Sequence, residues 1–152
     1  VLDAGVVRLP MALEDRGLPR QYRVTHLRRP PSDPGAVAFE AAPGGIGLGP
    51  FAPVHLRARP DGAGTRITWV RRTRIGGDSW DGEVPLSEER EAYRLRVLAA
   101  GTPVRELETA APEYTYAAAD RAADAAHGAL EIRVAQLSGA FGPGPETGIF
   151  LP

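Results

Sequence analysis

The stretch Ala92-Tyr-Arg-Leu-Arg-Val-Leu98 alternates apolar and basic side chains, and this alternation decides the fold class. Tyr93, Leu95 and Val97 project from one side of an extended chain, because successive side chains of a β-strand point to opposite faces. The two arginines between them project from the other side. One apolar and one charged face indicate an antiparallel strand that packs on a core through one face, since strands of a parallel sheet are apolar on both faces.

The same two-residue period recurs on both sides of this stretch. It is clear at Pro53–Arg59, Thr65–Arg72 and Ala129–Leu137, and further short strands are expected at Val104–Thr109, Glu113–Tyr116 and Ile149–Leu151. Trp69 shares a face with Ile67 and is predicted to be buried, whereas His55 falls on an outward face. About seven strands in residues 50–152 predict an all-β domain, a fibronectin type III-like (immunoglobulin-like) β-sandwich.

One segment of this region has the composition of a helix. Ala117–Ala126 is rich in alanine, the residue with the highest helix propensity, and Gly128 follows as a stop signal. The segment lacks the large apolar residues that a core helix would bury. We therefore expect a turn or two of helix in the connection between the fifth and sixth strands of the sandwich.

The first 49 residues differ from the rest of the chain. Proline and glycine are dense between Pro30 and Pro53, which indicates turns and a linker. Three short runs rich in β-forming residues, Val1–Leu9, Gln21–Leu27 and Ala36–Ala41, are expected to be strands. Because so short a segment buries little core, residues 1–49 are predicted to be a β-rich segment, either the end of a preceding domain in a longer protein or an annex packed on the following domain.

The composition of the 152 residues excludes several functions. There is no cysteine, which excludes disulfides, thiolate catalysis and cysteine-ligated metals. The 18 basic residues, all arginine, against 19 acidic ones give a net charge of −1, so no global basic field exists for nucleic acid. No apolar run approaches the roughly 18 residues of a membrane span. The absence of lysine and asparagine is typical of a GC-rich genome.

Eight arginines are expected on outward faces of the strands or in the loop after the second one. They are Arg57, Arg59, Arg66, Arg71, Arg72, Arg74, Arg94 and Arg96. Glu88, Glu89, Glu91 and Glu131 are available to pair with them across strands or loops. We favour a solvated surface of mixed charge over a polyanion site, and aromatic residues that could stack on bases do not alternate with these arginines.

A hydrolase is one interpretation of two short motifs. Gly77-Asp-Ser79 and Asp124-Ala-Ala-His127 resemble the serine block and the Asp-x-x-His block of GDSL-type hydrolases. That family also uses an oxyanion-hole asparagine, which this chain lacks, and no alternation of strands and helices is present to build its scaffold. We expect a polar turn and a helix end, and no enzyme.

Metal and cofactor sites are also not expected. The three histidines, His26, His55 and His127, are far apart, and none has a partner four residues away. The acidic residues of the Gly76–Glu83 loop do not have the spacing of an EF-hand, because Trp80 occupies the place of a second oxygen ligand.

The Gly76–Glu83 loop nevertheless holds the candidate binding residues. Trp80 lies between Asp78 and Asp81, and an aromatic side chain on a polar loop can stack on a sugar or anchor a protein contact. The alternative, which we favour, is that Trp80 folds back to cap the end of the sandwich against Val84 or Leu86. Both interpretations stay open at this point.

Several of these segments together resemble a known family. They are Pro53–Ala58, Ile67–Arg74, Gly77–Gly82 and Glu91–Arg96, continued by Tyr114–Tyr116, Val134–Ser138 and Gly142–Gly144. In this combination they are similar to the C-terminal region of the host-specificity proteins of gene transfer agents, large baseplate proteins with a TIM-barrel-like domain. The resemblance covers most of residues 48–145, and residues 1–47 resemble the β-rich segment that precedes this region.

The resemblance implies a structural and host-contact role at the tip of a phage-like tail, without catalysis. The partners would be other tail and baseplate proteins, and envelope polysaccharide of the host, with no nucleic acid. The protein would be made in the bacterial cytoplasm and reside in the particle. A carbohydrate-binding module that uses Trp80 and its polar neighbours on an envelope glycan is the alternative from a different class.

Overall fold

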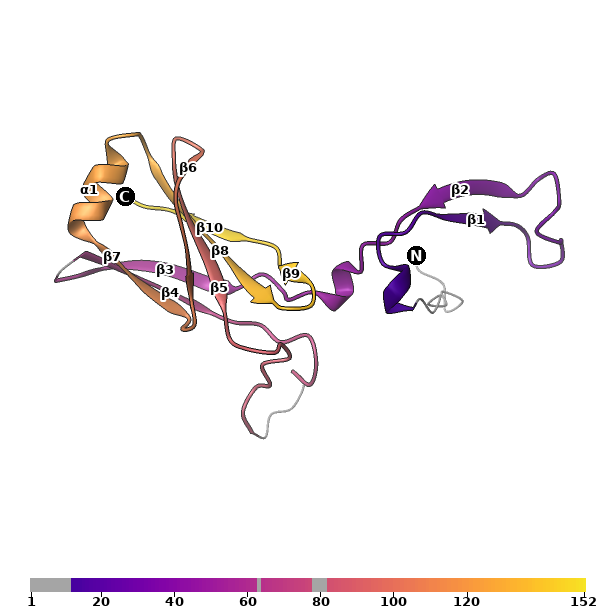
Figure 1. Ribbon diagram of the computed structural model, residues 1–152, viewed down its shortest axis with the longest axis horizontal. Helices are drawn as coiled ribbons and strands as arrows, with labels where there is room; N and C mark the ends of the chain where they lie inside the picture. The colour runs from indigo at the N-terminus through magenta and orange to yellow at the C-terminus, as the bar shows by residue number, and fades with distance from the viewer. Residues whose placement is uncertain (1–11, 63, 78–81) are drawn as a thin grey trace. The chain divides into compact units, whose positions relative to one another are not determined.

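The computed structural model describes residues 12–62, 64–77 and 82–152. The chain divides into two compact units, one ending at Ile46 and one comprising Gly47–Pro152 (Figure 1). Each unit is described by itself below. Among the described residues, no helix combines the length and the apolar character that crossing a membrane requires.

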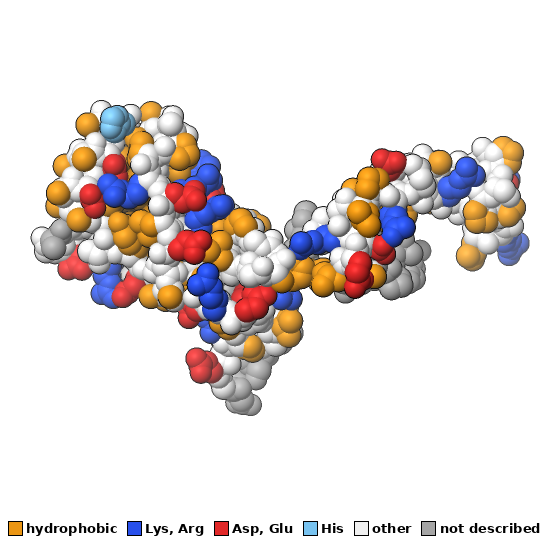
Figure 2. Space-filling view, viewed as in Figure 1, with side chains coloured by type: hydrophobic (Ala, Val, Ile, Leu, Met, Phe, Trp, Pro, Cys, Tyr) orange, Lys and Arg blue, Asp and Glu red, His pale blue; other side chains and the backbone are white. Residues whose placement is uncertain are grey.

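The described part of the first unit is a β-hairpin preceded by a short 3-10 helix, η1 (Leu13–Asp15). Strands β1 (Arg20–Val24) and β2 (Val37–Ala41) are antiparallel, and they lie within or overlap the strands expected at Gln21–Leu27 and Ala36–Ala41. The rings of Tyr22 and Phe39 stack with their centroids 5.4 Å apart. Hydrophobic side chains lie at the surface of this unit in Figure 2. The strand expected at Val1–Leu9 lies outside the described residues.

The second unit is a sandwich of two antiparallel sheets. One sheet has the order β3-β4-β7, and the other has the order β10-β8-β5-β6 with β9 paired to β8. Following the short helix η2 (Ile46–Leu48), the strands are β3 (Val54–Asp61), β4 (Gly64–Val70), β5 (Tyr93–Ala99), β6 (Thr102–Thr109), β7 (Glu113–Ala117), β8 (Leu130–Ser138), β9 (Gly142–Pro143) and β10 (Thr147–Phe150). This arrangement is the fibronectin type III-like sandwich that the sequence predicts.

The core lies between the two sheets and consists of the apolar residues of the alternating strands. Its buried members are Ile67, Trp69, Tyr93, Leu95, Val97, Ala99, Tyr116, Leu130, Ile132, Val134 and Leu151. The prediction that Trp69 is buried is confirmed, and its ring meets that of Tyr93 edge-on with centroids 5.2 Å apart. His55 is exposed, as predicted, and its φ of 55° accompanies a register shift between β3 and β4.

The one helix longer than a single turn in the described residues is α1 (Ala118–Ala125), which joins β7 to β8 as the sequence predicts. Its only buried residue is Asp124. The Asp124 carboxylate accepts hydrogen bonds from Arg105 Nε at 2.9 Å and from the Tyr116 hydroxyl at 2.7 Å. A polar contact therefore fixes α1 to the end of the sandwich, in place of the apolar contact that a core helix would make.

Candidate functional site

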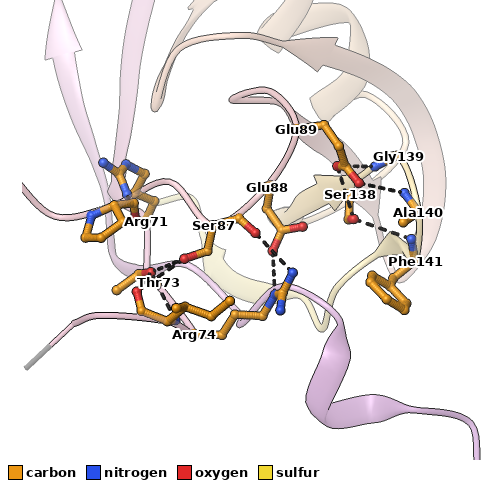
Figure 3. Close-up of polar contacts among 12 residues, drawn as sticks. Arg71, Thr73, Arg74, Ser87, Glu88, Glu89, Ser138, Gly139, Ala140 and Phe141 are labelled. Atoms are coloured by element: carbon orange, nitrogen blue, oxygen red, sulfur yellow. Dashed lines mark hydrogen bonds and ion pairs between the residues drawn. The ribbon is translucent and has the colours of Figure 1, made fainter. Parts of the chain in front are cut away.

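The β4–β5 loop, residues 71–92, joins the two sheets and is the longest connection in the sandwich. It contains the three candidate binding residues Asp78, Trp80 and Asp81, which lie outside the described residues, as does Ser79 of the hydrolase hypothesis. The structure describes the two stems of the loop, residues 71–77 and 82–92. These stems and the turn after β8 are drawn in Figure 3.

Arg71 ties the start of the loop to its second stem. Its guanidinium donates to the backbone oxygens of Val84, at 2.6 Å, and Pro85, at 2.8 Å. Its Nε also lies 4.0 Å from the carboxylate of Glu91. Because the planar guanidinium has donors in fixed directions, these contacts hold the two stems at a set separation.

A second tie joins two hydroxyl groups. Thr73 Oγ1 and Ser87 Oγ are 2.5 Å apart, and they lie 2.8 and 3.3 Å from the carbonyl oxygen of Ile75, so one hydroxyl donates to this carbonyl and the other donates to the first hydroxyl. Ser87 has a φ of 62°, in the left-handed region that a serine rarely adopts. The contacts of its hydroxyl explain how this backbone conformation is held.

The third tie is an ion pair between Arg74 and Glu88. Arg74 Nε lies 3.0 Å from Glu88 Oε1, and its Nη2 donates to the carbonyl of Ser87 at 3.0 Å. The Glu88 side chain is only 2% exposed, so solvent screens this pair weakly. The guanidinium also lies 5.9 Å from the centroid of the Phe141 ring, which belongs to the turn after β8.

Glu89 joins the loop to that same turn. Its carboxylate accepts hydrogen bonds from the backbone N–H groups of Gly139, at 2.9 Å, and Ala140, at 3.2 Å, and from the Ser138 hydroxyl at 3.3 Å (Figure 3). These donors and its own backbone N–H, which has the largest effect, hold the pKa of Glu89 below its usual value. The β4–β5 loop and the turn after β8 are thus one braced structure.

Sequence reasoning predicted part of this arrangement. Glu88 and Glu91 contact Arg74 and Arg71, as expected, whereas Glu131 pairs with Arg133 of its own strand, which is not one of the eight arginines considered. Glu89 was expected to pair with arginine as well, but it caps the backbone of the turn after β8. The sequence could not predict this contact, because Glu89 and Gly139 are 50 residues apart and only the fold brings them together.

Apolar side chains surround the braced stems. Ile75 and Val84 in the stems are 59% and 47% exposed, and Val70 at the end of β4 is 52% exposed. The guanidinium of Arg72 lies 4.8 Å from the centroid of the Phe51 ring. Exposed aliphatic groups beside paired polar groups are the composition of a contact surface.

The described residues contain no group of three or more histidine, aspartate or glutamate side chains arranged to hold a metal ion. The hydrolase hypothesis would need the Asp124 carboxylate to orient the His127 ring. In the structure this carboxylate accepts hydrogen bonds from Arg105 and Tyr116. The hydrogen bond between Asp124 and His127 joins their backbones, from His127 N to Asp124 O at 3.1 Å. The helix end that the sequence favoured at this position is thus present.

Comparisons with known proteins give a structural neighbour. No protein-family model and no curated protein matches this chain. Among solved structures, the chain is similar to the crystal structure of the rat CD45 extracellular region, domains d3-d4, with 11% sequence identity and a TM-score of 0.42. The alignment covers 99% of this chain and 73% of the CD45 chain.

Proposed function

We propose that this chain is a structural and host-contact module of a phage-like tail-tip protein of the gene transfer agent type, and that it acts by contact and not by catalysis. The observation that carries the proposal is the braced β4–β5 loop, which four side chains, Arg71, Thr73, Arg74 and Glu89, fasten at its base. A long loop on a rigid sandwich presents a surface to a partner with little loss of entropy on binding.

The apolar side chains around the stems favour a macromolecular partner. Ile75 and Val84 offer aliphatic surface, and Arg72 over Phe51 adds a cation–π pair of the kind found at protein interfaces. Other tail and baseplate proteins are the partners that the resemblance to the host-specificity family implies. The module would be synthesised in the bacterial cytoplasm and incorporated into the particle.

The experiment uses phage-like particles from the encoding bacterium. Immunogold labelling with antibodies against this chain is expected at the tail tip, and particles without the chain would contradict the proposal. In a second step, residues 75–84 are replaced by a short Gly-Ser linker, with a matched replacement of Ala100-Gly101 in the β5–β6 turn as control. We expect normal assembly of both particles and reduced adsorption to host cells for the loop variant alone.

The alternative is a carbohydrate-binding module for a bacterial envelope glycan, favoured by the position of Trp80 between two aspartates in this loop. Its test is binding of the purified protein to envelope polysaccharide from the bacterium that the particles infect. Saturable binding that Trp80→Ala abolishes would support it. Phe150→Ala, which removes an aromatic ring 71% exposed on β10, is the matched control and is expected to bind normally. Absence of binding by the unsubstituted protein would leave the assembly role.

A further inference from the structure

The outward face of the β3-β4-β7 sheet carries three arginines on adjacent strands. Arg59 on β3 lies directly opposite Arg66 on β4, and Arg57 lies opposite Thr68. Cβ atoms of directly opposite residues are about 5 Å apart, and like charges in that position destabilise a sheet. The arrangement therefore has an electrostatic cost for the isolated protein that a bound anion would remove.

Only one of these three arginines has a carboxylate partner. Arg66 donates to Glu113 of β7 through Nε, at 3.1 Å, and through Nη2. The hydrogen bond to Glu113, then the charge of Glu113 and, more weakly, the charge of Asp61 raise the pKa of Arg66. The side chains of Arg57 and Arg59 make no hydrogen bond and no ion pair within residues 12–62, 64–77 and 82–152. Two arginine side chains on this face thus have no ion-pair partner among the described residues.

The other sheet of the sandwich provides the contrast. There Arg94 and Arg96 share the carboxylate of Glu146, at 3.5 and 2.5 Å, and Arg133 lies 2.8 Å from Glu131. Each of these arginines has a carboxylate partner within the protein. Arginines on the other sheet thus have carboxylate partners, whereas Arg57 and Arg59 on the outward face of β3-β4-β7 have none in the described part of the chain.

The same side chains enclose a hollow in the surface. Arg57, Arg59, Arg66 and Thr68 line a depression of about 230 Å³. Since a water molecule takes up about 30 Å³, a tetrahedral oxyanion fits into this volume. Guanidinium groups bind phosphate and sulfate through paired N–H donors, and the Thr68 hydroxyl would add a further donor.

We propose that this face binds the sulfate or phosphate ester groups of an anionic polysaccharide. The outward positions of β3, β4 and β7 that the structure describes hold no phenylalanine, tyrosine or tryptophan. Recognition here would depend on charge, without the stacking that single-stranded nucleic acid uses. The surface lies on strands outside the β4–β5 loop, so this inference goes beyond the proposed function and does not rest on it.

The experiment compares dextran sulfate with neutral dextran of the same length, measured by calorimetry on the full chain at low and physiological salt. We expect saturable binding to dextran sulfate alone, and weaker binding at the higher salt concentration. The double variant Arg57→Gln/Arg59→Gln is expected to lower the affinity roughly tenfold or more, because it removes the charge-assisted donors. The control, Arg90→Gln/Arg133→Gln, removes the same charge from arginines that already face Glu108 and Glu131.

Thermal unfolding verifies that both double variants are folded, as expected for exposed side chains. Equal loss of affinity in the two double variants would overturn the proposal, since net charge alone would then explain binding. Tighter binding of a single-stranded oligonucleotide than of dextran sulfate would also overturn it. Trp80→Ala is expected to bind dextran sulfate normally, and a loss there would move the site to the β4–β5 loop and contradict the assignment.

Discussion

The hairpin of the first unit and the sandwich of the second have the same alternation of apolar and polar side chains, but they bury their apolar side chains to very different extents. Val24 and Val37 face each other across the hairpin and are 59% and 65% exposed, whereas Val97 and Val134 in the sandwich are fully buried. Two strands form one layer, and a core needs a second layer to cover the first. Alternation therefore predicts which side chains share a face, and a second sheet decides whether that face is buried.

The largest expected effect comes from the same type of substitution, leucine to alanine, made once in each unit. Leu95→Ala removes a fully buried side chain from the sandwich and is expected to cost about 2–5 kcal/mol of unfolding free energy. Leu27→Ala, at a side chain 99% exposed in the hairpin loop, is expected to change it by less than about 0.5 kcal/mol. Urea unfolding followed by far-ultraviolet circular dichroism, which reports on the strands of both units, measures both. Similar losses would contradict the division into a packed and an unpacked unit.

A second matched pair tests the polar contact that holds α1 to the sandwich. Asp124→Ala removes the acceptor for Arg105 Nε and the Tyr116 hydroxyl and is expected to cost about 1–3 kcal/mol, because the Tyr116 hydroxyl is left without a partner and Arg105 keeps only Asp120. Asp120→Ala, one turn earlier on the same helix, removes a carboxylate that is 45% exposed. It is expected to change the stability by less than about 0.5 kcal/mol. Equal effects would mean that the buried contact is no stronger than a surface ion pair.

The same carboxylate predicts a dependence of stability on pH. The pKa of Asp124 is lowered from its ordinary value of 3.8, because Arg105 and then Tyr116 donate hydrogen bonds to the charged form. The folded state thus binds this proton less readily than the unfolded state. Its stabilising effect is present above pH 4 to 5 and is lost as the pH falls through the pKa of the folded protein.

Melting temperatures between pH 7 and pH 2 measure this dependence. The unsubstituted protein is expected to lose stability below about pH 5. Asp124→Asn, which does not titrate, is expected to lose less over the same range, and Glu89→Gln is expected to behave likewise because the pKa of Glu89 is also lowered. A variant curve parallel to that of the unsubstituted protein would exclude the residue concerned as a source of the dependence.

The strands of the sandwich were predictable because each carries its own signal. In Tyr93–Ala99 the period is visible within seven residues, so face and burial follow from the sequence alone. The two-residue β9 and the first residues of β6, Thr102 and Pro103, were not predicted, since pairing with a neighbouring strand defines them and their own composition does not.

The braced loop was less predictable for a related physical reason. Thr73 meets Ser87 across 14 residues, and Glu89 meets Ala140 across 51 residues. These contacts exist because two sheets bring two loops to one end of the sandwich, and no single segment encodes that arrangement. The sequence could identify the loop and its polar residues, but it could not identify their partners.

A smaller effect tests a polar side chain within the packed unit. Gln136 is fully buried on β8, and both atoms of its side-chain amide lack a hydrogen-bond partner in the described structure. Gln136→Met keeps a similar volume without the desolvated amide and is expected to raise the unfolding free energy by about 1 kcal/mol. Chemical denaturation measures the change. A loss of stability would indicate that the amide is hydrogen-bonded in solution, for example by an internal water molecule.

The smallest expected effect concerns the hairpin, where packing is limited to one pair of rings. Phe39→Ala removes the stack with Tyr22, and aromatic pairs contribute about 0.5–1.5 kcal/mol. Hydrogen exchange of the β1 and β2 amides is expected to become roughly two- to tenfold faster, with unchanged protection of β5 and β8. Arg23→Ala, on the opposite face of β1, is the control and is expected to have less effect on the same amides. If Phe39→Ala also lowered protection in the sandwich, the two units would unfold together and would not be independent in stability.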